Sequence, residues 1–172
     1  MILRLLVLAG LLVSGPVLAR PYSTSYLSFE LPDTWECTLE QTEFVCSEAG
    51  QSTNRRSIII FTAKEQGTQD SLDQYFDHLS TPMTLRDGTG KVLGTSTPEL
   101  PKRVTVKGVE WVVGQHAGSE VRNYNTRYYA TVHDGIAVLV TFSAHVSASE
   151  EAFRQFNPSF QSLRIRNPLV SP

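Results

Sequence analysis

Ser143 and His145 are the residues of this sequence best spaced for nucleophilic catalysis. They stand two apart at the end of an apolar run that predicts a strand, so their side chains share one face. A serine nucleophile also needs a base within hydrogen-bond reach, an orienting acid and an oxyanion site, none of which this spacing supplies. Residues 94–98, Gly-Thr-Ser-Thr-Pro, lack the second glycine of a G-x-S-x-G elbow. The pair is therefore either a small serine-type hydrolase site or two polar residues at a strand end.

Neither the histidines nor the carboxylates form a pattern typical of a catalytic or metal centre. Helical metal sites usually carry two histidines on one face, as in H-E-x-x-H, and no such pair occurs among His78, His116, His133 and His145. Acidic residues cluster beside a predicted turn and at a predicted helix start, where solvation and the helix dipole account for them; they are Glu36, Glu40, Glu43, Asp70 and Asp73. We therefore predict neither a metal site nor a cofactor.

A binding pattern lies in residues 121–132, where Arg122, Tyr124, Thr126 and Tyr128 alternate onto one face of a predicted strand. Arg and Tyr are enriched at binding hot spots because they combine contact area with directed polar groups. The same alternation is also typical of a solvent face, or of a face covered by a helix, where Tyr is simply a good strand former. We predict Arg122, Tyr124 and Tyr128 as binding residues on this surface, with the long loop 81–101 as a second candidate.

The two cysteines, Cys37 and Cys46, are placed for a disulfide. Residues 34–39 and 43–47 can pair as a hairpin about the midpoint between the two cysteines. The two side chains then face each other across the strands, at a separation that a disulfide accepts. An even cysteine count in an exported chain favours oxidation. Two free buried thiols are the alternative.

Residues 1–19 have the order of a secretory signal peptide. Arg4 gives a positive start, residues 5–13 form an apolar run, and Val-Leu-Ala at 17–19 is a small-residue exit. The run is shorter than the roughly 20 residues of a membrane span. We expect cleavage after Ala19, an exported product in the periplasm or outside the cell, one domain over residues 20–166 and a flexible tail over 167–172. An uncleaved N-terminal anchor is the alternative.

The overall charge excludes one class of partner. The formal net charge is −2, with Lys and Arg interspersed among the acids. Nucleic acids and anionic membrane surfaces require a concentrated basic patch, and this sequence has none. We therefore expect a protein or small-molecule partner and no nucleic-acid partner. The short apolar run predicts that the chain itself is not an integral membrane protein.

Periodicity divides the mature chain into strands and two helices, which indicates an α+β domain. Strand patterns occur at residues 26–31, 34–39, 43–47, 57–63, 104–106, 109–113, 121–132 and 136–142. The run at 57–63 is apolar on both faces, which favours a central strand. A helix at 72–79 is predicted to be capped by Asp70, and proline and glycine predict a long loop after it.

The second helix is predicted from a capping box. Ser147 and Glu150 have the spacing that satisfies amides at a helix start, and Phe153 and Phe156 follow on one face. We expect this helix to stop near residue 157, because Pro158 disfavours helical geometry in the residue before it.

The order of these elements resembles the PsbP/Mog1/DcrB-like superfamily. The similarity comprises the strand at 26–35, Tyr-Leu-Ser-Phe-Glu-Leu-Pro-Asp-Thr-Trp, the helix at 72–79, the Val-Glu-Trp strand at 109–111, the hairpin at 128–142 and a closing helix that runs into Ser-Leu-Arg at 162–164. It implies an antiparallel β-sheet flanked by two main helices, in proteins that act as binding or assembly factors. It supplies no ligand motif, and the cysteine hairpin is not part of its pattern.

These observations predict an exported, non-enzymatic binding or assembly module of the cell envelope or secreted space. A small serine-type hydrolase at Ser143 and His145 is one alternative. A periplasmic inhibitor or immunity protein is another, since the compartment permits it.

Overall fold

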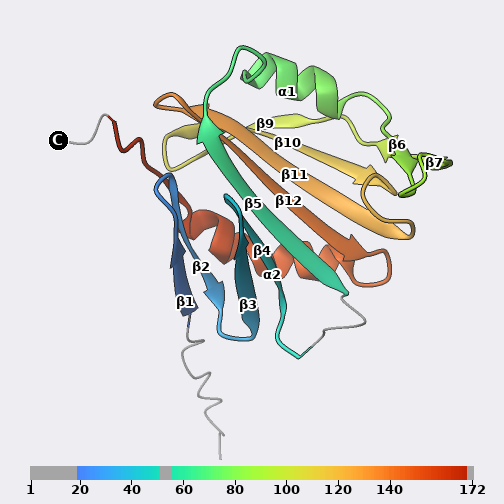
Figure 1. Ribbon diagram of the computed structural model, residues 1–172, viewed down its shortest axis with the longest axis horizontal. Coiled ribbons are helices and arrows are strands. Elements are labelled where there is room, and N and C mark those ends of the chain that lie inside the picture. Colours follow the sequence, from blue (N-terminus) through green and yellow to red (C-terminus); the bar gives the residue numbers. More distant parts are fainter. Residues whose placement is uncertain (1–18, 51–55, 170–172) are drawn as a thin grey trace, which may run out of the picture.

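The computed structural model describes residues 19–50 and 56–169 and is built mainly from antiparallel strands (Figure 1). The largest sheet has eight strands, in the order β3 (Trp35–Glu40), β4 (Glu43–Glu48), β5 (Ser57–Glu65), β12 (Ile136–His145), β11 (Tyr124–His133), β10 (Val109–Ala117) and β8 (Thr97–Pro98), with β9 (Lys102–Val106) also paired to β10. A three-stranded sheet has the order β1 (Ala19–Ser23), β2 (Leu27–Pro32) and β13 (Arg164–Ile165). The smallest sheet is the hairpin of β6 (Thr84–Arg86) and β7 (Val92–Thr95).

Two helices complete this part of the chain, α1 (Leu72–Leu79) and α2 (Ser149–Ser162). The prediction of an antiparallel α+β fold is confirmed, and β5 is a central strand as expected. The predicted signal peptide lies outside the described residues except for Ala19, which begins β1. Residues 170–172 of the predicted tail also lie outside them. No helix that the structure describes has the length and apolar character that crossing a membrane requires.

Tight two-residue turns set the register of the hairpins. Lys107 and Gly108 have φ angles of 51° and 83°, and Asp134 and Gly135 have φ angles of 49° and 75°. Left-handed backbone at both central residues is what a type I′ turn requires, and its twist matches that of the flanking strands. The sequence signals at both turns are therefore confirmed, and β9–β10 and β11–β12 pair as predicted.

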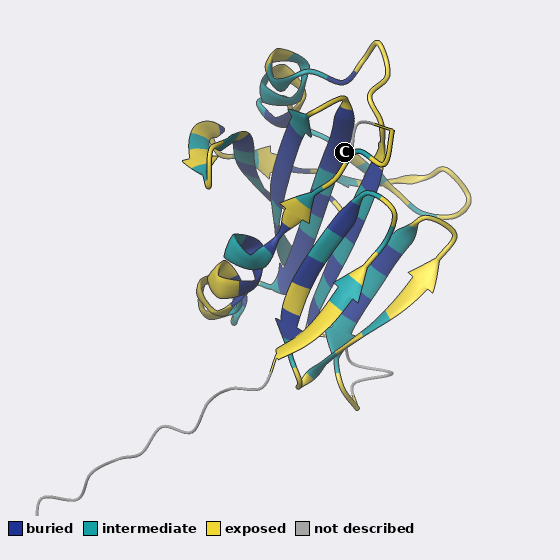
Figure 2. Cartoon of the chain, turned by 90° about the vertical axis from the view of Figure 1, so that its left-hand side faces the viewer, coloured by how far each residue is buried: buried dark blue, intermediate teal, exposed yellow. Residues whose placement is uncertain are grey.

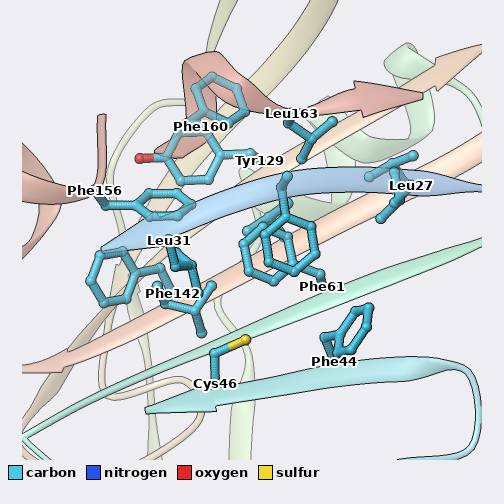
Figure 3. Close-up of a cluster of buried hydrophobic side chains, with 14 of the residues drawn as sticks. Leu27, Leu31, Phe44, Cys46, Phe61, Tyr129, Phe142, Phe156, Phe160 and Leu163 are labelled. Atoms are coloured by element: carbon cyan, nitrogen blue, oxygen red, sulfur yellow. The ribbon is translucent and has the colours of Figure 1, made fainter. Parts of the chain in front are cut away.

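The main core lies between one face of the large sheet and a layer formed by α2 and the three-stranded sheet (Figure 3). Phe61 of β5 stacks on Phe29 of β2, with ring centroids 3.7 Å apart. Phe156 and Phe160 of α2 pack against Tyr129 of β11. Figure 2 shows buried residues concentrated on the inner strands and exposed residues at the hairpin ends. These contacts join the two sheets and α2 into one hydrophobic core.

The opposite face of the large sheet carries α1, and we call it the outer face. Leu79 of α1 packs with Val112 and Tyr128 in a second, smaller core. The helix comes close to β10 at Gly114, where an added Cβ would lie 3.0 Å from Leu79 Cβ. A larger residue at this position would require Leu79 to move by a few tenths of an ångström. In Figure 1, α1 lies at the top of the molecule and α2 behind the strands, so the helices cover different faces.

The start of α1 differs from the prediction. Its N-cap is Ser71, whose hydroxyl accepts a hydrogen bond from the Gln74 amide. The Asp70 carboxylate instead accepts from the Gly67 amide and the Tyr75 hydroxyl and pairs with Lys64. These competing partners explain why Asp70 does not cap the helix.

Both predicted ends of the second helix are wrong. The N-cap of α2 is Ala148, without a side-chain hydrogen bond, and the Ser147 hydroxyl bonds the His145 ring instead. The helix continues through Pro158 to residue 162. A proline in a helix costs one backbone hydrogen bond and steric strain, and the buried Phe160, two residues later, offsets this cost by packing against the sheet.

The segment predicted as a long loop is partly structured. It contains β6, β7 and β8, and Ser96 closes the base of the β6–β7 hairpin. The Met83 amide donates to Ser96 Oγ at 2.8 Å, and the Ser96 amide donates to the Met83 carbonyl at 2.8 Å. This pairing fixes Met83 beside the end of α1.

Candidate binding site

The cysteine hairpin forms as predicted. Cys37 and Cys46 are paired residues of β3 and β4, and their sulfur atoms form a disulfide 2.05 Å long. The Cys46 side chain is fully buried in the main core. The disulfide therefore joins the edge strand β3 to β4 and has a structural role.

Ser143 and His145 are not brought together as a nucleophile and its base. Ser143 is buried, and its hydroxyl lies 2.9 Å from that of Thr126 on β11. The His145 Nδ1 atom lies 2.9 Å from the Ser147 hydroxyl, and its ring packs edge-on against Tyr124. Each side chain has a local partner that explains its position.

The three predicted binding residues do not share one exposed face. Arg122 is exposed in the turn before β11, which begins at Tyr124 because Asn123 adopts a left-handed conformation with φ 65°. Tyr124 is half-buried, and Tyr128 is buried, with 3% of its surface exposed. The interpretation of Tyr128 as a surface residue is therefore wrong, since α1 covers its part of the outer face. A role of these residues in binding stays a prediction.

Tyr128 instead lies on the wall of a cleft of about 600 Å³ between α1 and the outer face of the sheet, here called the α1 cleft. One wall is α1, with Tyr75, Asp77 and His78. The floor and the other walls come from β11, β12, Met83 of the predicted loop and Glu120 of the β10–β11 loop. The cleft thus joins two surfaces that the sequence predicted separately.

The buried Tyr128 hydroxyl positions Glu120 at the rim of the α1 cleft. It donates a hydrogen bond to Glu120 Oε1 at 2.6 Å and lies 2.8 Å from Ser119 Oγ. Burial and the bond to the Glu120 carboxylate raise the pKa of Tyr128 above its ordinary value, so its proton stays in place near neutral pH. Tyr128 therefore acts as a fixed donor that orients one oxygen of Glu120.

A second network holds α1 at the other end of the cleft. The Tyr75 hydroxyl donates to Asp70 Oδ1 at 2.8 Å, and Lys64 Nζ lies 2.8 Å from Asp70 Oδ2. Burial and the bond to Asp70 raise the pKa of Tyr75. Burial alone would raise the pKa of Asp70, but hydrogen bonds from Lys64, the Gly67 amide and Tyr75 outweigh it and hold this pKa below its ordinary value.

Replacing Asp70 with Asn should make the stability of the protein less dependent on pH. A lowered pKa in the folded state adds stability above the unfolded value, near 4, and this stability is lost as the pH falls through the folded value. We expect Asp70→Asn to cost about 1–2 kcal/mol at pH 7, mainly through hydrogen bonds, since Lys64 is exposed and its charge is screened. Urea unfolding at pH 7 and pH 2 measures this. If Asp70→Asn lowered the free energy of unfolding by the same amount at both pH values, this prediction would be wrong. Asp33→Asn, in an exposed turn, is the control.

His116 is a buried contact that the sequence did not single out. Its side chain is 0% exposed, with Nδ1 2.9 Å from the Ser96 hydroxyl and Nε2 2.9 Å from the Leu79 carbonyl oxygen. Because a carbonyl only accepts, Nε2 carries the proton and donates to the Leu79 carbonyl. His116 therefore joins the end of α1 to the base of the β6–β7 hairpin, and both border the α1 cleft.

Within residues 19–50 and 56–169, no three histidine, cysteine or carboxylate side chains gather as metal ligands.

No protein-family model matches the sequence, and no curated protein matches it in sequence. Solved structures do match. The solution structure of cyanobacterial PsbP (CyanoP) from Synechocystis sp. PCC 6803 is similar over 92% of this chain and 99% of its own, with a TM-score of 0.60 and 11% identity.

Two further structures are similar. The Ran-binding protein Mog1p of Saccharomyces cerevisiae matches 87% of this chain and 96% of its own, with a TM-score of 0.54 and 8% identity. PA94 of Pseudomonas aeruginosa, a protein of unknown function described as a putative regulator, matches 87% of this chain and 98% of its own, with a TM-score of 0.55 and 11% identity. This chain has the PsbP/Mog1-like fold. At these identities the likeness concerns the fold alone, and the predicted resemblance is confirmed at that level.

The PsbP/Mog1-like fold of this chain has a second cavity, of about 410 Å³, between α2 and the ends of β2 and β3. Its walls include Leu31, Ile59 and Phe156, which also belong to the main core, and Trp35, which packs against that core. This cavity is a gap at the edge of the core. Glu30, Glu48 and Gln155 also line this cavity, whereas the α1 cleft lies on the outer face of the sheet, beneath α1.

Proposed function

We propose that this chain is an exported, non-enzymatic binding module of the cell envelope or secreted space, and that it holds its ligand in the α1 cleft. In this proposal residues 1–19 are removed and residues 20–166 form the mature domain. The observation that carries it is the cleft itself: about 600 Å³ lined by an apolar floor and a few polar groups. Small-molecule sites have this size and composition.

The surroundings of the candidate nucleophile support a non-enzymatic role. The buried Ser143 hydroxyl is engaged by Thr126, and the nearest predicted base bonds Ser147. A serine hydrolase requires the base to bond the nucleophile in a site open to substrate. Nothing in the described contacts of these residues favours a hydrolase over a binding module.

The disulfide supports export, because cysteines persist as disulfides mainly in oxidising compartments. The fold is compatible with binding, since the yeast protein of this fold is a Ran-binding protein. A shared fold does not carry a ligand across, however, so the partner of this chain has to follow from its own site.

Filling the α1 cleft should abolish ligand capture without unfolding the protein. Leu139 of β12 is half-buried on the outer face and lines the cleft. Leu139→Trp adds volume there and leaves the main core unchanged. We expect at least about a tenfold loss of the bound species, corresponding to loss of about 1.4 kcal/mol or more of binding free energy. Affinity capture from an extract of the source cells, with protein and small-molecule mass spectrometry, measures it.

The matched control is Leu39→Trp, the same substitution at a side chain 54% exposed on β3. It should retain every species that the original chain captures. Arg122→Ala is a further arm, because Arg122 belongs to the same loop as Glu120 and is proposed to contact the partner beside the cleft. Equal capture by Leu139→Trp and the original chain would exclude the cleft as the site.

A further inference from the structure

The charged groups of the α1 cleft are acidic. Asp77 lies on α1 and Glu120 on the β10–β11 loop, and His78 is the remaining titratable group of the lining besides Tyr75 and Tyr128. No Lys or Arg lines the cleft, and among the described residues neither Asp77 nor Glu120 forms an ion pair. The nearby Asp70 and Asp73 are different, because they pair with Lys64 and Arg103. Two carboxylates therefore face the cleft without a counter-charge.

One of these carboxylates is held in place from inside the protein. The buried Tyr128 hydroxyl bonds Glu120 Oε1 at 2.6 Å, while the ring packs edge-on against the buried His116 at a centroid distance of 5.6 Å. Glu120 is exposed, and an exposed glutamate normally samples several rotamers. A fixed donor on one oxygen reduces that freedom and leaves the other oxygen available to a ligand. The arrangement is pre-organised for a donor that enters the cleft.

Below the carboxylates, the floor of the cleft is apolar. Leu79, Met83, Ala130 and Leu139 line it. An apolar chain would contact these side chains, and a cationic head group would reach the rim. Charge-assisted hydrogen bonds to carboxylates are among the strongest in proteins, whereas an anion would meet repulsion from both acids.

We infer that the α1 cleft binds an organic cation, an ammonium or guanidinium group carried on an apolar stem. This inference rests on the proposed function and names its ligand class. The cation has two sources with the same chemistry: a free alkylamine, or a lysine or arginine side chain of a protein partner. In both cases Glu120 and Asp77 bind the cation, and Leu139 and Met83 contact the stem.

Titration of the ¹⁵N-labelled protein with three six-carbon probes tests the inference. Hexylammonium, hexanol and hexanoate share the stem and differ in head-group charge. We expect hexylammonium to shift the amide signals of residues 74–79, 120 and 128 saturably, and to bind at least about tenfold more tightly than hexanol and hexanoate. Equal binding of hexanol would overturn the inference that the ligand is a cation, while leaving the cleft as a binding site. No response to hexylammonium would also overturn that inference.

Charge-neutralising variants provide the matched comparison. Asp77→Asn with Glu120→Gln should weaken hexylammonium binding by about tenfold or more, whereas Asp33→Asn with Glu40→Gln changes the net charge equally at exposed positions in another part of the chain and should have no effect. Equal weakening in both double variants would reduce the effect to overall charge and overturn the inference. Nα-acetyl-lysine methylamide separates the sources: tighter binding than hexylammonium indicates a protein side chain, and weaker binding a free amine. The result for Leu139→Trp tests the proposed function independently.

Discussion

Replacing Phe61 with Ala is expected to lower the free energy of unfolding by about 3–5 kcal/mol, the largest effect of any single substitution considered. Phe61 is 1% exposed on β5, and its ring stacks on Phe29 of β2 at 3.7 Å between centroids. It also contacts Phe156 of α2, so one ring joins the large sheet, the three-stranded sheet and the helix. Its removal loses apolar burial and leaves a cavity that three elements cannot easily close. Urea unfolding of the purified protein measures the difference.

The size of the Phe61 effect is checked by two companions. Phe61→Leu keeps most of the apolar volume and should cost clearly less than Phe61→Ala. Leu39→Ala removes a side chain that is 54% exposed on β3 and should change the free energy of unfolding by less than about 0.5 kcal/mol. If Phe61→Ala cost no more than Leu39→Ala, the packing of the two sheets around this ring would be wrong.

Local sequence signals predicted the strands and hairpins of this fold well. The Lys107-Gly108 and Asp134-Gly135 turns need left-handed backbone at both positions, which few other dipeptides adopt easily, so a short window was enough. The midpoint between Cys37 and Cys46 likewise predicted the register of β3 against β4. These features depend on neighbours along the chain or on one partner strand.

The helix ends were predicted poorly because the side chains there have partners that capping and proline rules do not take into account. Asp70 is drawn away from the cap position by Lys64 of β5, and Ser71 replaces it. Pro158 does not end α2, because Phe160, two residues beyond it, packs against Tyr129 of the large sheet. The rules gave no sign of either contact, although Lys64 is only six residues from Asp70, whereas Tyr129 is far from Phe160 along the chain.

The candidate site was predicted only in part for a related reason. Period-two alternation correctly placed Tyr128 on a common face with Thr126, since both face away from the main core. It did not say that α1 would cover that face, although a covering helix was one of the alternatives considered. Glu120 joins the site through a loop whose path depends on the β10–β11 pairing. The cleft is thus a tertiary feature, while its parts were visible separately.

Removing the disulfide is the second change with a large expected effect. Cys37→Ala with Cys46→Ala should lower the free energy of unfolding by about 2–3 kcal/mol, because the bond restricts the unfolded chain and ties the edge strand β3 to β4. Ala is preferable to Ser because the Cys46 position is fully buried and a hydroxyl there would lack a partner. For a domain of this size the melting temperature should fall by about 5–10 °C while the circular dichroism spectrum stays the same.

The reductant experiment separates the bond from the side chains. The original chain should lose stability in reductant by about the same amount as the double variant, and the double variant should be insensitive to reductant. Iodoacetamide should add no mass to the denatured protein before reduction and two carbamidomethyl groups after it, because both thiols are in the bond. Labelling without reduction would contradict the disulfide. A melting temperature equal to that of the original chain would instead show that the β3–β4 hairpin is held by its strand pairing and the burial of residue 46 alone.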